Sequence, residues 1–256
     1  MGKELKDFNS NLIMESIKNK MPFYNERHFQ FELAMAIRDF YKDNKNIQID
    51  FEAYYGTQNE TDDNTKRNYT DIVVYDKNGN FIAIELKYCL DDNNNKEKRY
   101  KYKNGENEIT IAKKGAVDNC RYDFLFDVHR LEQISKNAKY ENNSLKNFYC
   151  GYTILISNSK KTWLKSKKEH PNDINFHIAD GTKTKRVCFW LGGINFAVNN
   201  DGLNYKGKQV LRRDFNLKKE YDCCWQPAGE NNYYFEDSNK NNPSPPFKYL
   251  VIKIEK

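Results

Sequence analysis

The stretch "YTDIVVYDKNGNFIAIELKYC", Tyr69–Cys89, decides the fold because it holds two apolar strands and the turn between them. Its centre, "DKNG", begins with Asp76 and ends with Gly79, the residue type that most readily takes the positive φ of a hairpin turn. The second strand carries two charges, Glu85 and Lys87, inside an otherwise apolar run. Alternate side chains of a strand share a face, so these two charges are predicted to point the same way.

The length of the hairpin loop decides whether a third charge, Asp71, joins them. A two-residue loop, 78–79, would pair Asp71 with Leu86 and turn its carboxylate away from Glu85. A three-residue loop, 77–79, with its glycine in the left-handed bulge position places Asp71 opposite Glu85. The "DKNG" sequence suits this second turn, so we expect two carboxylates to face each other beside a lysine.

Two facing carboxylates in a half-buried strand repel each other unless a cation lies between them. Oxygen ligands with little histidine select Mg²⁺ or Mn²⁺ over zinc, and the backbone carbonyl of Leu86 is a further candidate ligand. Glu32 interrupts the apolar stripe of a preceding helix, so it is either a third acid of this site or a helix-flank residue. Glu52, in the strand before the hairpin, is the alternative for the same role.

The segments on either side of the hairpin predict a mixed α/β fold. Residues 25–42 carry apolar side chains three and four apart, which is typical of an amphipathic helix, and residues 47–55 alternate as a strand. Residues 114–139 predict a long helix, and residues 148–157 predict a buried strand. A hairpin is antiparallel, whereas a crossover through a long helix favours a parallel neighbour, so we expect a mixed central β-sheet flanked by helices.

The chain of 256 residues is long enough for one hydrophobic core. We therefore expect a single domain, 1–256, with a core at 22–157 and a β-rich C-terminal elaboration at 158–256 packed on that core. Two short strands are expected in the elaboration, at 185–191 and 247–254.

Composition excludes some classes of protein. The 42 Lys and Arg against 36 Asp and Glu give a net charge of +6, which suits a polyanionic partner without requiring one. The six cysteines form no CxxC pair, which argues against a zinc ribbon or a secreted disulfide framework and favours a reduced, cytoplasmic protein. No apolar run approaches the roughly 20 residues of a membrane span, so we expect no membrane association.

These residues match a known pattern. Asp71, thirteen further residues and then Glu85-Leu86-Lys87, preceded by a helix with Glu32, resemble the PD-(D/E)XK nuclease superfamily and its restriction-endonuclease-like αβββαβ core. The resemblance covers about residues 26–157, with Thr70 where the family name has proline. It implies that Asp71 and Glu85 bind the catalytic metal, that Lys87 assists the attacking water, and that a helical acid such as Glu32 supports the metal.

The resemblance implies a Mg²⁺- or Mn²⁺-dependent endonuclease that hydrolyses phosphodiester bonds, with DNA as the expected substrate and a homodimer as one possible assembly. A second hypothesis is an inactive pseudo-nuclease that serves as a nucleic-acid-binding or protein-interaction module. A third is a generic α/β protein whose hairpin charges form a structural ion pair. In that third case, Asp71 would face away from Glu85.

Two groups of cations are candidates for nucleic-acid binding. Residues 91–108 are so polar that we expect a mobile surface loop, within which alternating cations and tyrosines could grip a phosphate backbone or form a solvated charge run. Its candidate cations are Lys98, Arg99, Lys101 and Lys103. On the long helix, Arg121 and Arg130 are candidates for phosphate contact, although an i,i+3 ion pair between Asp127 and Arg130 is favoured.

Overall fold

A computed structural model gives the fold of the greater part of the chain. It describes residues 2–57, 68–90, 98–102, 108–111, 117–140, 145–166, 173–191, 204–205, 208–209, 214–229, 233–235 and 246–256. The helices are α1 (Ser10–Ile17), α2 (Glu26–Phe40), α3 (Val117–Asn137) and α4 (Lys160–Trp163), with 3-10 turns at Leu5–Asp7, Lys18–Lys20 and Ile174–Phe176.

The longer strands belong to the region that the sequence predicts as the core and to the C-terminus. They are β1 (Gln48–Thr57), β2 (Asn68–Tyr75), β3 (Asn80–Cys89), β4 (Lys98–Tyr102), β5 (Glu108–Ile111), β6 (Ala138–Tyr140), β7 (Asn147–Ser157), β15 (Tyr233–Phe235) and β16 (Lys248–Glu255). The two-residue strands are β8 (Thr182–Lys183), β9 (Val187–Cys188), β10 (Asn204–Tyr205), β11 (Lys208–Gln209), β12 (Phe215–Asn216), β13 (Asp222–Cys223) and β14 (Gln226–Pro227).

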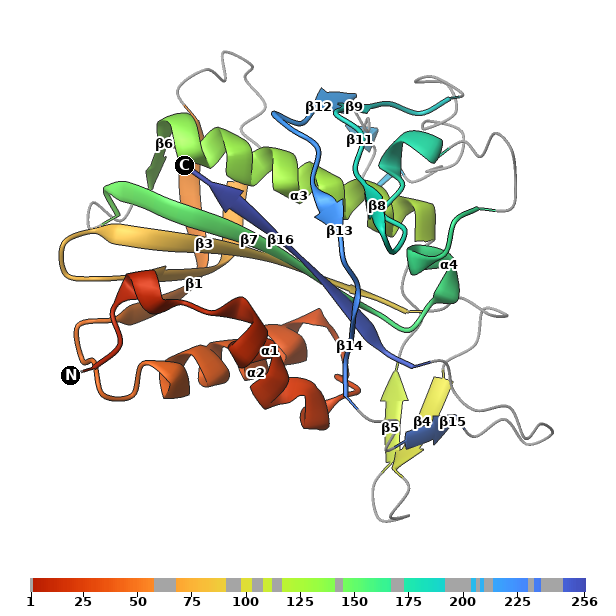
Figure 1. Ribbon diagram of the computed structural model, residues 1–256, viewed down its shortest axis with the longest axis horizontal. Coiled ribbons are helices and arrows are strands. Elements are labelled where there is room, and N and C mark those ends of the chain that lie inside the picture. Colours follow the sequence, from red (N-terminus) through yellow and green to blue (C-terminus); the bar gives the residue numbers. More distant parts are fainter. Residues whose placement is uncertain are drawn as a thin grey trace.

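A seven-stranded sheet in the order β14-β16-β7-β3-β2-β1-β6 forms the centre of the molecule (Figure 1). Its neighbours pair antiparallel except β3 and β7, which pair parallel. The chain passes through α3 between these two strands, so the predicted parallel neighbour is confirmed. The fold is therefore mixed α/β, as predicted, with a mainly antiparallel and partly parallel central sheet.

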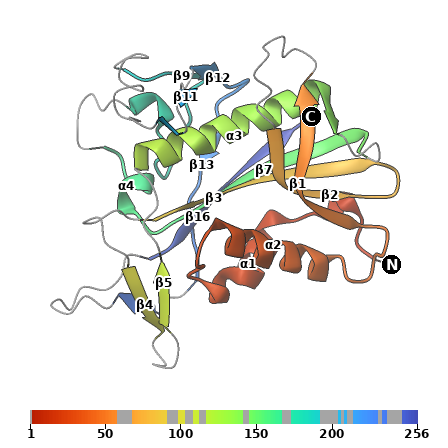
Figure 2. The same cartoon turned by 180° about the vertical axis from the view of Figure 1, so that it is seen from behind.

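The sheet is covered on both faces. Helices α1 and α2 lie together on one face and α3 lies on the other, which Figure 2 shows from behind. In β2 and β3 the buried apolar side chains alternate between the two cores: Val73, Phe81 and Ala83 pack on the side of α3, and Ile72, Ile82 and Ile84 on the side of α2. The same alternation assigns the odd-numbered residues 71, 85 and 87 to the face of α3.

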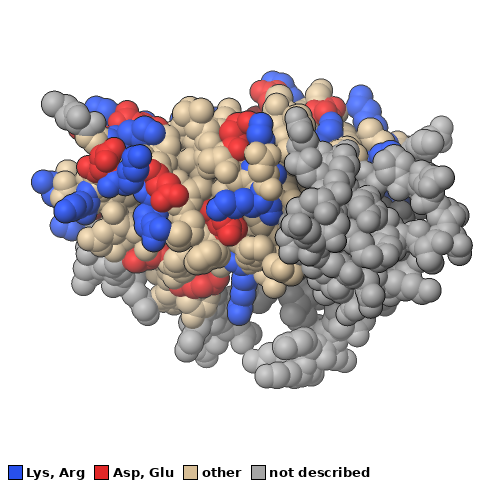
Figure 3. All heavy atoms as spheres, turned by 90° about the horizontal axis from the view of Figure 1, so that it is seen from below, with Lys and Arg blue, Asp and Glu red and all other residues tan. Residues whose placement is uncertain are grey.

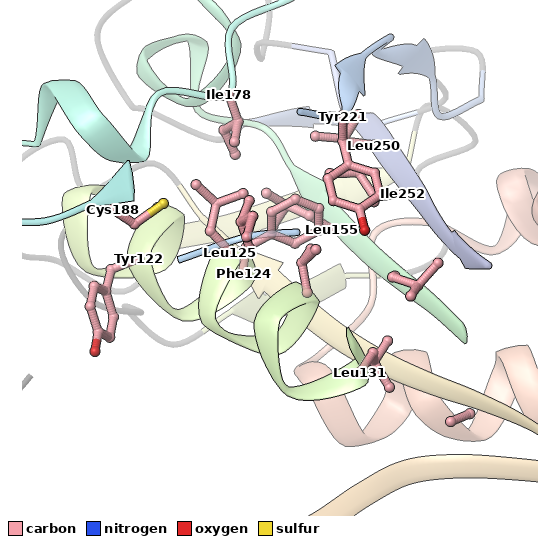
Figure 4. Packing of buried hydrophobic residues seen from close by; sticks show 14 of the residues in the cluster. Tyr122, Phe124, Leu125, Leu131, Leu155, Ile178, Cys188, Tyr221, Leu250 and Ile252 are labelled. Carbon is pink, nitrogen blue, oxygen red and sulfur yellow. The ribbon is translucent and has the colours of Figure 1, made fainter. Parts of the chain in front are cut away.

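The core on that side joins α3 to the C-terminal part of the chain. Figure 4 shows Phe124 and Leu125 of α3 packed with Leu155 of β7 and with Leu250 and Ile252 of β16. Trp163, Ile178, Cys188, Phe215 and Trp225 belong to the same cluster. Residues after 158 thus share a hydrophobic core with the long helix and the central sheet.

Two sequence expectations need correction. The segment 91–108 is not only a loop, because β4 lies within it and pairs with β5 and with the distant strand β15. The strand expected at 185–191 contracts to β9, and helix α1 was not anticipated. Within the described residues, no helix is long and apolar enough to cross a membrane.

Candidate active site

The hairpin turn between β2 and β3 has the three-residue loop that the sequence favours. Gly79 has a φ of 80°, and its N–H donates to the Asp76 carbonyl at 3.0 Å. The N–H of Asp76 donates to the carbonyl of Asn80, also at 3.0 Å, which closes the loop. The strands then pair from Tyr75↔Phe81 to Ile72↔Ile84, and one further step in this register places Asp71 opposite Glu85.

On the edge of β3 that faces β2, the backbone N–H groups beyond Ile84 donate hydrogen bonds to carboxylates instead of to strand β2. The Leu86 N–H donates to Asp71 Oδ2 at 2.6 Å. The Tyr88 N–H donates to Oε2 of Glu26, from the first turn of α2, at 2.9 Å. The N–H groups of residues 86 and 88 point to the same edge of the strand, so two carboxylates gather where the β2–β3 ladder ends.

Helix α2 directs two of its polar side chains to this edge. It begins at Glu26 because the side chain of Asn25 accepts the His28 N–H at 2.9 Å. One turn later, Gln30 Nε2 donates to the Asp71 carbonyl at 2.6 Å and to Glu52 Oε1 at 3.2 Å. Glu52 thus reaches the site only through Gln30.

Helix α3 closes the site on the other face with two charged residues one turn apart. Asp127 Oδ2 lies 2.5 Å from Lys87 Nζ, and Asp127 Oδ1 accepts from Arg130 Nη1 at 2.8 Å. Arg130 Nη2 lies 3.3 Å from Glu85 Oε1. Glu85, Arg130, Asp127 and Lys87 therefore form a row of alternating charge between β3 and α3, and the predicted i,i+3 ion pair on α3 is confirmed.

Burial governs the ionisation of the acids in this cluster. Burial raises the pKa of Asp71 to about 6, although Lys87 and the hydrogen bond from Leu86 oppose the rise. Burial also raises the pKa of Glu85 well above its ordinary value, although Arg130 opposes it. Ionisation of Asp71 and Glu85 in the metal-free protein therefore costs substantial free energy.

The lysine of the cluster responds in the opposite way. Burial alone would lower the pKa of Lys87, but the carboxylates around it, of which Asp127 has the largest effect, outweigh burial and raise that pKa. Lys87 Nζ also donates to the Leu86 carbonyl at 3.0 Å. Lys87 therefore acts as a fixed positive charge and not as a base.

The formal charges and donor atoms of the cluster fit a divalent cation. The acids Glu26, Asp71, Glu85 and Asp127 outnumber the cations Lys87 and Arg130 by two when all are ionised. The Oε1 atom of Glu85 is buried, makes no hydrogen bond among the described residues and lies 3.3 Å from Arg130 Nη2, so it is a candidate ligand. With Asp71 and the Leu86 carbonyl, the donors are all hard oxygen atoms, which suit Mg²⁺ or Mn²⁺.

Within the described part of the chain, no three His, Cys, Asp or Glu side chains already form a group that could hold a metal ion. A cation bound by Asp71 and Glu85 would therefore also use the backbone carbonyl, water or the substrate, which is the usual way in which Mg²⁺ is held.

The structure does not join Glu32 to this cluster. Its carboxylate lies 2.5 Å from Lys20 Nζ and 3.7 Å from His28 Nε2, which is the helix-flank alternative. The helical acid that contacts β3 is Glu26. The signal for it was the spacing, because Glu26 is four residues before Gln30 and seven before Leu33 on the buried stripe of α2.

The predicted nucleic-acid-binding cations have different surroundings. Arg121 is only 5% exposed, donates to Asp173 Oδ2 at 2.6 Å and also bonds the Lys161 carbonyl, so its guanidinium is used within the fold. Arg130 belongs to the row of charges. Lys98, Arg99 and Lys101 lie on β4, of which the structure describes only the backbone, and Lys103 lies outside the described residues.

The lower face of the molecule in Figure 1 is shown as a surface in Figure 3. Its described part carries acidic and basic side chains interspersed with each other. This face therefore offers no uniformly basic area among the described residues.

Comparisons of the chain with protein-family models, with curated proteins and with solved structures found no match.

Proposed function

We propose that this protein is a metal-dependent nuclease that hydrolyses phosphodiester bonds, and more particularly a DNA endonuclease of restriction-enzyme-like type. The observation that carries the proposal is the register of the β2–β3 ladder, which ends at Ile72↔Ile84, one step before Asp71 and Glu85, together with the hydrogen bond from the Leu86 N–H to Asp71 Oδ2. The element order supports it, because α2, β1, β2, β3, α3 and β7 follow the αβββαβ order that the sequence resemblance implies, with β4 and β5 inserted before α3 and β6 after it.

In the proposed reaction each residue has a distinct task. Asp71 and Glu85 would hold Mg²⁺ or Mn²⁺, and the Leu86 carbonyl would be a further ligand. The cation would stabilise charge on the phosphate and make water more acidic. Lys87 remains protonated, so it orients the attacking water through hydrogen bonds and offsets charge that develops on the phosphate oxygens. As the water oxygen bonds to phosphorus, the bond to the leaving-group oxygen would break and the proton of the water would pass to solvent, because Lys87 is already protonated.

A supercoiled-plasmid assay tests the proposal. The protein is expected to nick or linearise plasmid in Mg²⁺ or Mn²⁺ and to be inactive in EDTA. Asp71→Asn and Glu85→Gln should each lower cleavage by about 100-fold or more, because removing a group needed for phosphoryl-transfer charge stabilisation has effects of that order. Glu15→Gln, which breaks an exposed i,i+3 pair between Glu15 of α1 and Lys18 of the following 3-10 turn, is the matched control and should cleave normally.

The result that contradicts the proposal is cleavage that Asp71→Asn and Glu85→Gln leave undiminished, since the activity would then come from elsewhere. Single-stranded DNA and RNA serve as parallel substrates. Cleavage of RNA alone would retain the reaction type and correct the substrate from DNA to RNA.

A binding module without catalysis is the second candidate. The observation that favours it is the internal pairing of Glu85 with Arg130 and of Lys87 with Asp127, which neutralises four charges of the cluster without a metal. Isothermal titration with Mn²⁺ separates the two candidates. Absence of Mn²⁺ binding would favour the module, and binding that Asp71→Asn abolishes would favour the nuclease.

A further inference from the structure

Arg130 contacts three oxygen atoms around the proposed metal site. They belong to Asp127 Oδ1 at 2.8 Å, to the Tyr69 carbonyl at 2.5 Å and to Glu85 Oε1 at 3.3 Å. We infer that Arg130 is the internal counter-cation of Glu85 in the metal-free protein and that it weakens divalent-cation binding. This inference rests on the proposed function, because it concerns the cation that Asp71 and Glu85 would bind.

The three contacts of Arg130 are unequal. The two shorter ones are hydrogen bonds that fix the planar guanidinium to α3 and to β2. The contact with Glu85 is the longest, and Glu85 Oε1 makes no hydrogen bond in it. Glu85 can therefore exchange Arg130 for a metal ion while Arg130 keeps its other two partners.

The charge of Arg130 persists when a metal ion arrives. A guanidinium does not lose its proton in proteins, so its positive charge remains beside the incoming cation. The side chain of Glu85 is only 2% exposed, so water screens the charges around it weakly. Competition for Glu85 and repulsion between like charges both act in the same direction, toward weaker metal binding.

Removing the charge of Arg130 should strengthen Mn²⁺ binding, whereas structural damage to the site would weaken it. Arg130→Gln should bind Mn²⁺ about tenfold more tightly than the parent protein, which corresponds to about 1.4 kcal/mol. Arg130→Lys keeps the charge and should stay near the parent affinity. Asp127→Asn removes the anion that holds both Arg130 and Lys87, leaves both cations to Glu85, and should weaken Mn²⁺ binding. Damage to the site would weaken binding in all three variants.

Isothermal titration of the full chain with Mn²⁺ measures these affinities, and Lys18→Gln is the control because it removes a cation from an exposed i,i+3 pair with Glu15 of α1. Equal or weaker binding by Arg130→Gln overturns the inference while leaving the proposed function in place. If the parent protein binds no Mn²⁺ at all, the proposed function fails first, and the inference fails with it.

A second measurement avoids a variant that could fail to fold, since removing Arg130 leaves two buried carboxylates short of a partner. In ¹⁵N-labelled parent protein titrated with Mg²⁺, the guanidinium signal of Arg130, assigned with Arg130→Lys, is expected to shift as Glu85 turns to the metal. Saturation with Mg²⁺ that leaves this signal in place would overturn the inference.

Discussion

Asp71→Asn tests the electrostatic cost of the site directly, because asparagine keeps an oxygen for the Leu86 N–H and removes the charge. Burial raises the pKa of Asp71 from 3.8 to about 6 in the folded protein. A difference of about two units corresponds to about 3 kcal/mol at 1.36 kcal/mol per unit. The ionised carboxylate therefore destabilises the metal-free protein, and the variant is expected to be the more stable protein at neutral pH.

The stability of the parent relative to Asp71→Asn should decrease as pH rises. The folded-state pKa lies above the unfolded value, so the folded protein binds more protons between about pH 4 and pH 6. The free energy of unfolding of the parent therefore falls relative to Asp71→Asn as pH rises through this interval, and the contribution of Asp71 itself stays constant above it. Glu85 is present in both proteins, but the charge of Asp71 raises its pKa, so Asp71→Asn also lowers the pKa of Glu85 and adds to the difference.

Thermal unfolding in EDTA from pH 4 to pH 8 measures this difference. For a chain of this size about 1 kcal/mol shifts Tm by about 2–4 °C, so the Tm of Asp71→Asn should gain about 6–12 °C on the parent across the range. Asp222→Asn, which changes an exposed aspartate on β13, should show no such trend. A Tm difference that does not vary with pH would refute the reasoning. Added Mg²⁺ should then stabilise the parent and not Asp71→Asn.

Gly79→Ala should destabilise the protein by about 1–2 kcal/mol in urea unfolding, because φ at this position is 80°. The variant should also reduce cleavage by disturbing the register of Asp71. An unchanged urea midpoint would contradict this prediction. Glu26→Gln should weaken Mn²⁺ binding by about tenfold, or about 1.4 kcal/mol, because its charge acts on both Asp71 and Lys87. Glu32→Gln should leave Mn²⁺ binding unchanged, and equal effects of the two variants would count against the placement of Glu26. The buried Glu132 accepts hydrogen bonds from the Lys218 N–H and from the Tyr221 hydroxyl. Glu132→Ala should therefore lower stability by about 1–3 kcal/mol for each donor left without a partner. Thermal unfolding without a loss of Tm would argue against this role.

The hairpin was predictable because its information is local. The "DKNG" turn and the alternation in the two strands are enough to set the register, and that register places Asp71 opposite Glu85. The parallel pairing of β3 with β7 followed from the length of the intervening helix. These features depend on residues close in sequence or on general rules of chain connection.

The contacts made by the helices were not predictable in the same way. The sequence indicates that Asp127 and Arg130 pair on one helix, but it does not indicate how α3 lies over β3, and therefore it does not predict the contact of Asp127 with Lys87. The sequence offered Glu32, with Glu52 as its alternative, and did not indicate the contact of Glu26 with β3, because that contact depends on which side of α2 faces the strand edge. Strand β4 was missed because one of its partners, β15, lies far along the chain.

Helix α3 carries two sets of contacts on adjacent turns. Asp127 and Arg130 hold the charges of β3, and Glu132 anchors the segment that contains Lys218 and Tyr221. Strand β16, from the end of the chain, is also an inner strand of the central sheet, between β14 and β7. The C-terminal segment therefore braces the helix that positions the site. A fragment cut to 22–157 would lose both the segment that Glu132 anchors and strand β16 of the central sheet. We therefore expect that the smallest unit able to hold Lys87 and Glu85 in place extends to β16.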